Sequence, residues 1–104
     1  MNILVVLCTF PSLDVARQIG TALVKAQLAA CVNLCPAVES IYRWQGKVES
    51  AQEVLAVIKT TRAGYDALET RLKEMHPYEV PEILTFEVKK GLADYLAWMR
   101  KESG

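Results

Sequence analysis

The chain has 104 residues, of which 52% are apolar and 23% are charged, a composition that excludes a disordered protein. Its 12 basic and 12 acidic residues leave no basic surface for a phosphate backbone, which argues against nucleic acid as a partner. We expect one domain over residues 1–104 and no membrane span, because no apolar run reaches about 18 residues.

The first elements are a strand and a helix. An apolar, β-branched run over residues 2–9 predicts a strand that is buried on both faces. The run lacks the charged region and cleavage site of a signal peptide, so we interpret it as part of the fold. Ser12 is a suitable N-cap for a helix that runs to about Gln27, with apolar residues at three- and four-residue spacing.

Residues 30–61 predict one long β-hairpin that turns at Gln45-Gly46. Each arm has about 15 residues and would span about 50 Å. The flanking helices, of about 12 to 16 residues, would span only about 18 to 24 Å. The far half, residues 39–51, is therefore expected to project from the subunit, and Pro36 predicts a bulge or bend in the outgoing arm.

The projecting half of the hairpin carries large side chains: Ile41, Tyr42, Trp44 and Val48. An exposed ribbon of this kind aggregates unless something pairs with it, so we expect copies of the chain to cover one another. Tyr42 and Trp44 are read either as anchors between subunits or as part of a ligand-binding patch.

A second helix is expected after Thr61, which is a suitable N-cap, and Pro77 ends it. Residues 76–82 form a loop with two prolines. A last strand is expected over residues 83–89, and a short amphipathic helix follows Gly91.

The order β-α-β-β-α-β plus a terminal helix predicts an α+β fold, a ferredoxin-like sandwich. Both main helices would pack on one face of the sheet. The other face is expected to be bare although residues 54–58 are apolar on both sides, and no segment of the chain remains to cover it. This is a second argument for an oligomer.

The sequence offers few residues for catalysis. His76 is the only histidine, and no phosphate-binding loop, zinc-protease or calcium-loop motif occurs. We therefore expect no enzyme activity and no organic cofactor. The three cysteines, Cys8, Cys31 and Cys35, are an odd count that favours a reducing compartment. Cys31 and Cys35 would lie about 13 Å apart on a strand, too far to hold one ion.

Cys8 and His76 are the candidate metal ligands, since a thiolate and an imidazole suit copper or zinc. Two ligands are too few for a closed site in one chain. Met75 would add a thioether only if its helix stripe rotated. The alternative interpretation is a buried thiol and a histidine that caps the loop.

Several motifs together carry a family resemblance. These are Leu-Ala-Ala-Cys-Val-Asn at 28–33, Ser-Ile-Tyr-Arg-Trp-Gln-Gly-Lys at 40–47, Lys-Thr-Thr at 59–61 and His-Pro-Tyr-Glu-Val-Pro-Glu at 76–82. With them, the chain from its first strand to Trp98 resembles the CutA family of divalent-cation tolerance proteins.

The resemblance implies a cytoplasmic homotrimer of ferredoxin-like subunits that is linked to tolerance of copper and other divalent metals. In bacterial members, copper ligation is assigned to the cysteine that ends the first strand and to a histidine pair before Pro-Tyr. Cys8 matches the cysteine and His76 the second histidine, whereas Met75 stands in the first position of the pair.

Two functions are favoured at this point. One is a trimeric, metal-binding or metal-responsive protein. The other is a trimeric scaffold or signal transducer, similar in architecture to the PII proteins, that binds a small ligand or a partner protein in a cleft between subunits. The candidate cleft residues are Tyr42, Trp44, Glu53, Lys59, Tyr78 and Glu79. An enzyme that uses this cleft is a third, weaker alternative.

Overall fold

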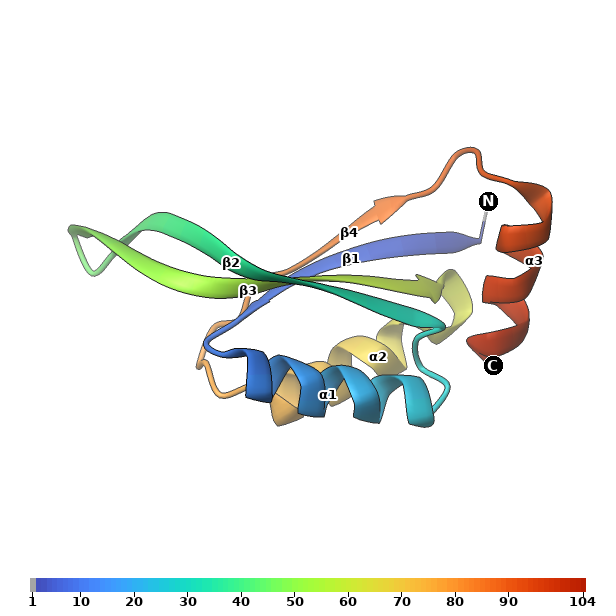
Figure 1. The fold of residues 1–104 in the computed structure, drawn as a ribbon, viewed down its shortest axis with the longest axis horizontal. Coiled ribbons are helices and arrows are strands. Elements are labelled where there is room, and N and C mark those ends of the chain that lie inside the picture. The colour runs from blue at the N-terminus through green and yellow to red at the C-terminus, as the bar shows by residue number, and fades with distance from the viewer. Residues whose placement is uncertain (1) are drawn as a thin grey trace.

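The computed structural model describes residues 2–104 and contains a four-stranded antiparallel sheet with three helices (Figure 1). The elements in chain order are β1 (Ile3–Phe10), α1 (Leu13–Lys25), β2 (Cys31–Trp44), β3 (Lys47–Thr61), α2 (Arg62–Met75), β4 (Ile83–Glu87) and α3 (Ala93–Glu102). The strand order is β2-β3-β1-β4. The predicted α+β, ferredoxin-like element order is confirmed.

Both predicted helix caps are present. The Ser12 hydroxyl accepts a hydrogen bond from the Val15 N–H, and the Thr61 hydroxyl accepts one from the Gly64 N–H, each at 3.2 Å. These bonds satisfy N–H groups that the first turn of a helix leaves unpaired. α1 ends at Lys25, two residues before the predicted end, because Gln27 has a φ of 58° and cannot continue a right-handed helix.

Helices α1 and α2 cover one face of the sheet (Figure 1). The alternation of a strand sends every second side chain of β1 and β3 into this layer. Val6, Cys8 and Phe10 of β1 lie opposite Ile58, Ala56 and Val54 of β3, and all six are buried. Leu23 from α1 and Leu68 and Leu72 from α2 complete the core.

Helix α3 corrects one expectation about the other face. Leu96 and Met99 of α3 pack with Ile3 and Ala30 in a second buried cluster, so part of that face is covered by the chain itself. The sequence pattern placed α3 in chain order but did not indicate where it docks. None of the helices within residues 2–104 is long and apolar enough to cross a membrane.

The rest of this second face, which we call the open face, remains apolar and accessible. Val5, Leu7 and Val57 are only half-buried, and Leu84 and Phe86 of β4 are each 54% exposed. The register places Val5 beside Phe86 and Leu7 beside both Leu84 and Val57, so these side chains share one face.

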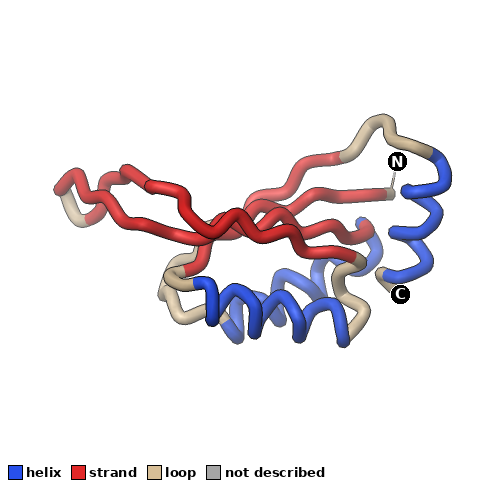
Figure 2. The backbone as a smooth tube through the Cα atoms, in the orientation of Figure 1, coloured by secondary structure: helices blue, strands red, loops and turns tan. Residues whose placement is uncertain are grey.

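The β2–β3 hairpin projects beyond the helices as predicted (Figures 1 and 2). Its turn uses positive φ at both central residues, 50° at Gln45 and 81° at Gly46, which matches the twist of a two-residue hairpin. The register shifts between Cys35 and Val38, where Pro36 interrupts the ladder. On the projecting half, Ile41 is 71% exposed.

Candidate functional site

The loop of residues 76–82 closes over one end of the sheet and forms the candidate site. Pro77 disfavours helical backbone at His76, whose ψ of 133° ends α2 and turns the chain toward β1. The loop brings the rings of His76 and Tyr78 against the end of β1, and Tyr78 reaches Glu53 of β3. We call Cys8, Phe10, Glu53, His76 and Tyr78 the loop cluster.

His76 is buried and both of its ring nitrogens have partners. Nδ1 lies 3.1 Å from the Tyr78 backbone nitrogen and accepts its N–H, which leaves Nε2 to donate to the Thr9 carbonyl at 2.8 Å. The imidazole also stacks on Phe10, with 4.9 Å between ring centroids. These contacts define one neutral tautomer whose available lone pair is already used.

Cys8 is fully buried beneath this loop. Burial, followed by the negative charges of Glu82 and Glu53, raises the pKa of the Cys8 thiol to about 12. The residue is therefore a protonated thiol at neutral pH, and its Sγ lies 3.8 Å from the Thr9 carbonyl. Only a thiolate is a strong metal ligand.

These observations test whether the predicted ligands fit a metal. Cys8 is protonated, His76 has no free nitrogen, and Met75 packs against the main core. Within residues 2–104, no three histidine, cysteine, aspartate or glutamate residues gather closely enough to hold an ion. In this conformation the three residues do not fit a closed copper centre.

Tyr78 joins the loop to the base of the hairpin. Its hydroxyl donates to Glu53 Oε2 at 2.6 Å, and its ring lies 4.8 Å from the ring of His76. Burial, then the hydrogen bond and charge of Glu53, raise the pKa of Tyr78 well above its usual range. The phenol therefore stays protonated as the donor of a short, charge-assisted hydrogen bond.

The other predicted cleft residues lie at different distances from this cluster within one chain. Tyr42 is near enough to contribute to the raised pKa of Tyr78, whereas Trp44 lies further along the exposed hairpin. Glu79 is exposed on the loop. Lys59 lies about 20 Å along β3 from Glu53, where its ammonium donates to the Tyr95 hydroxyl of α3 at 3.2 Å.

Sequence reasoning missed two groups that contact His76, the Phe10 ring and the Thr9 carbonyl. Phe10 carried a signal, since an aromatic residue directly before a proline at the end of a buried strand is well placed to pack on a loop. A backbone carbonyl carries no such signal, because every residue has one.

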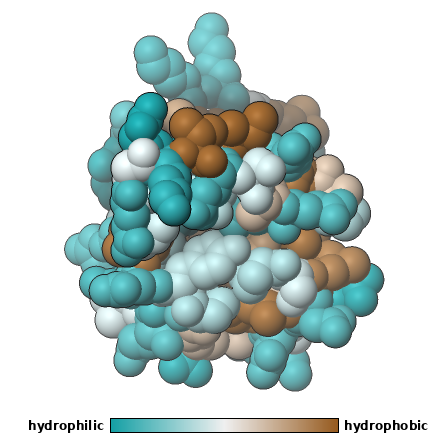
Figure 3. All heavy atoms as spheres, turned by 90° about the vertical axis from the view of Figure 1, so that its left-hand side faces the viewer, coloured by the Kyte–Doolittle hydropathy of each residue, from teal (hydrophilic) through white to brown (hydrophobic). Residues whose placement is uncertain are grey.

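The view from the hairpin side shows hydrophobic side chains interrupting a hydrophilic surface in several places (Figure 3).

The match to known proteins extends over almost the whole described fold. Residues 4–102 match the family model described as CutA1 divalent ion tolerance protein. The chain is 50% identical to the divalent-cation tolerance protein CutA of Thermus thermophilus over 96% of its length and 97% of that protein.

Solved structures agree with this match. The divalent cation tolerance protein from Thermus thermophilus has a TM-score of 0.95 at 49% identity, covering 98% of this chain and 99% of that one. CutA from Xylella fastidiosa has a TM-score of 0.97 at 40% identity, with both chains covered completely.

Proposed function

Because this chain belongs to the CutA1 divalent ion tolerance family, we propose that it takes part in the tolerance of divalent cations, with copper as the first cation to test. The match of residues 4–102 to the family model carries this proposal. The family is named for tolerance and not for a reaction, so the proposed role is binding or response without catalysis. A cytoplasmic location is proposed with it, in keeping with three free cysteines.

The proposed assembly is a homotrimer. Two features support it: the accessible apolar residues of the open face, and the hairpin that carries Ile41 and Trp44 away from the subunit. Surfaces of this kind on a single chain are typical of subunit contacts.

Sedimentation of the purified protein at low micromolar concentration tests the assembly. We expect a trimer, and we expect Trp44→Ala to shift the equilibrium toward smaller species, because a central aromatic anchor is commonly worth about 2 kcal/mol or more. A single-copy wild-type protein removes the trimer. An unchanged sedimentation coefficient for Trp44→Ala removes the anchor role only.

Metal contact is proposed at Cys8 and His76, with Met75 as a third candidate, under a condition set by the loop cluster. The thiol would have to lose its proton, and the imidazole would have to release either the Tyr78 N–H or the Thr9 carbonyl. Any such binding is therefore expected to be pH-dependent and to loosen residues 76–82.

Titration of the trimer with Cu(II) and with Cu(I) tests this contact. Cys8→Ser and His76→Ala are expected to lose binding, and Cys35→Ser, which removes an exposed thiol instead, is expected to keep it. Equal binding by all four proteins would rule out Cys8 and His76 while leaving the family assignment untouched.

A ligand-binding transducer is the second candidate, favoured by the Tyr78–Glu53 hydrogen bond that couples the loop to the hairpin. The proposed cleft would combine Tyr78 of one subunit with Lys59 of another. Thermal melting in the presence of a panel of small anions tests it. A rise in melting temperature that both Tyr78→Phe and Lys59→Met abolish supports the cleft; a rise that both retain places the ligand elsewhere.

A further inference from the structure

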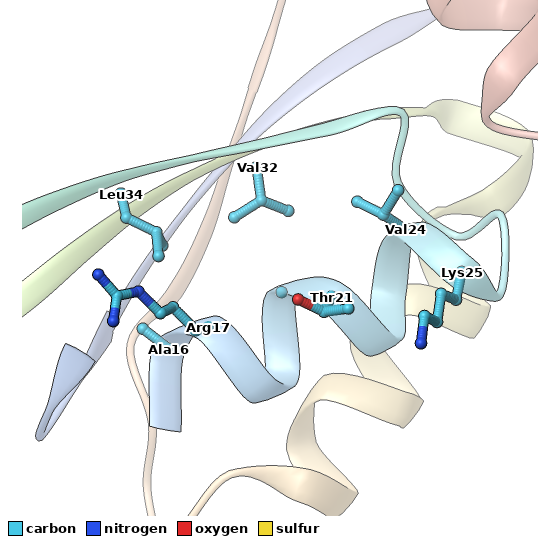
Figure 4. A pocket seen from close by; sticks show the side chains of 8 residues that line it. Ala16, Arg17, Thr21, Val24, Lys25, Val32 and Leu34 are labelled. Carbon is cyan, nitrogen blue, oxygen red and sulfur yellow. The ribbon is translucent and has the colours of Figure 1, made fainter. Parts of the chain in front are cut away.

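A groove separate from the loop cluster runs between α1 and β2, and we call it the α1–β2 groove. Its volume is about 290 Å³. Ala16, Gly20, Val32 and Leu34 line its apolar interior, and Arg17 and Lys25 are among the polar residues that line it from α1. Figure 4 shows Val32 and Leu34 extending from β2 toward the helix.

The groove arises from the close approach of the helix to an edge strand. A Cβ added at Gly20 would lie 3.3 Å from Val32 Cγ1, so the absence of a side chain at Gly20 lets α1 lie close to β2. Within residues 2–104 no strand lies on the outer side of β2, and its apolar side chains Val32 and Leu34 are only half-buried. Val24 on the same helix is 40% exposed.

The outer edge of β2 carries backbone groups with which a further strand could pair. An antiparallel strand with one neighbour directs the backbone N–H and C=O groups of alternate residues away from that neighbour. An extended peptide can add to such an edge, with its own alternate side chains entering an adjacent groove. Helix α1 lies alongside this part of β2 and forms the wall of the groove that faces β2 (Figure 4).

Two cationic side chains of α1, Arg17 and Lys25, line the groove and would favour a peptide that carries acidic residues. Arg17 and Lys25 are eight residues apart on α1, or about 12 Å along its axis. Both are exposed, and the ion pair that residues 2–104 contain joins Arg62 to Glu87, elsewhere on the molecule. In an extended strand, residues four apart are separated by about 13 Å on one face, which matches this spacing.

We propose that the α1–β2 groove binds an extended acidic segment of a partner protein, which adds as a strand to the outer edge of β2. The segment has the pattern acid-x-apolar-x-acid. Its central apolar side chain lies over Val32 and Leu34 at the mouth of the groove, and its two carboxylates lie near Arg17 and Lys25. This site shares no residue with the loop cluster and does not depend on metal binding.

Panning a random peptide library displayed on phage against the full chain tests the proposal. Enrichment of the acid-x-apolar-x-acid pattern is expected on the wild type and not on the double variant Arg17→Glu, Lys25→Glu. A synthetic peptide of the enriched pattern is expected to bind the double variant at least about tenfold more weakly, because like charges would then face each other.

Four further measurements separate a docked strand from general charge attraction. The same peptide with lysines in place of its acids is expected to recover binding to the double variant. The control pair Arg71→Glu, Lys73→Glu, on the exposed side of α2, is expected to bind like the wild type. Thr21→Trp, which fills the groove without changing charge, and a peptide methylated on alternate backbone nitrogens are each expected to lose binding.

Several results overturn the proposal. They are a library that enriches no acidic pattern, an enriched peptide that the double variant binds equally well, and full binding by the methylated peptide. A change of subunit number in the double variant, measured by sedimentation, would assign the groove to a second copy of this chain instead. None of these results bears on the proposed tolerance function.

Discussion

At the closed end of β1, the side chains of His76 and Tyr78 find their hydrogen-bond partners within the chain, whereas on the projecting hairpin Ile41 and Val48 have little around them. Both regions adjoin the same four-stranded sheet, one at the end of β1 and the other along the β2–β3 hairpin. The loop of residues 76–82 covers the first region, and the length of the β2–β3 hairpin carries the second beyond any helix (Figure 2).

This difference separates two sources of stability. Groups whose partners lie in the same chain contribute to the folding of the subunit. Apolar groups left accessible by the chain contribute only when another molecule covers them. Substitutions in the two regions should therefore affect different measurements: unfolding free energy for the loop cluster, and association for the hairpin and the open face.

Phe10→Ala is expected to have the largest effect on the subunit. Phe10 is buried and stacks on His76, so its truncation removes core packing and leaves the imidazole without support. We expect a loss of about 3 to 5 kcal/mol in the free energy of unfolding, measured with denaturant.

Ile41→Ser is the matched substitution on the hairpin, where the side chain is 71% exposed. It should change the unfolding free energy of the subunit by no more than about 0.5 kcal/mol while weakening association. Both proteins are measured at concentrations where the wild type is dissociated. Similar losses for Phe10→Ala and Ile41→Ser would contradict the division between the two regions.

Tyr78→Phe addresses the link between the regions. It removes the donor of the 2.6 Å hydrogen bond and leaves the half-buried Glu53 carboxylate without this partner. A hydrogen bond to a charged group is worth about 1.5 to 3 kcal/mol, and we expect a loss of this size on denaturation. Tyr95→Phe, which removes an exposed hydroxyl near Lys59, should cost less than about 1 kcal/mol. Equal losses of unfolding free energy for Tyr78→Phe and Tyr95→Phe would mean that Tyr78 contributes through its packing and not through its hydrogen bond.

The regular parts of this molecule are the parts that sequence patterns predict. The turn at Gln45-Gly46, the caps Ser12 and Thr61 and the interruption at Pro36 are local signals, each set by one residue's backbone preference or side-chain chemistry. They fix the ends of elements, and the element order then permits few topologies.

The contacts of the site were less predictable because their partners are not local. The sequence indicated Cys8 and His76 as chemically suitable, but the state of His76 depends on the carbonyl of Thr9, 67 positions away. Burial of Cys8 likewise depends on how the loop closes. Within one chain, Lys59 lies apart from Tyr78 because distance along a strand separates them, which residue types alone do not reveal.

Alkaline pH provides a specific test of the buried thiol. In the unfolded chain Cys8 loses its proton near pH 9, whereas in the folded chain its pKa is about 12. The folded state therefore holds an extra proton between these values, and stability falls as pH rises from 9 to 12, by at most about 1.4 kcal/mol per pH unit.

Cys8→Ser is the control for this titration, because serine does not ionise in that range. Lysines and tyrosines titrate there in both proteins, so the difference between the two slopes of unfolding free energy against pH isolates Cys8. A parallel decline in both proteins would show that Cys8 ionises equally in the folded and unfolded states.

Gly46→Ala should produce a small loss of stability that is confined to the hairpin. Gly46 has a φ of 81° and no atoms within 4 Å of an added Cβ, so the cost of alanine is backbone strain alone, about 1 kcal/mol. Gly64→Ala is the matched change in α2, where the added Cβ meets Thr61 Oγ1 at an ordinary 3.4 Å and helix propensity favours alanine. Because the hairpin is not part of the buried core, hydrogen exchange should show the loss from Gly46→Ala within residues 39–51 and leave β1 protected. Faster exchange in β1 would mean that the projecting ribbon and the core unfold as one unit, and that the distinction between the two regions applies to surfaces only.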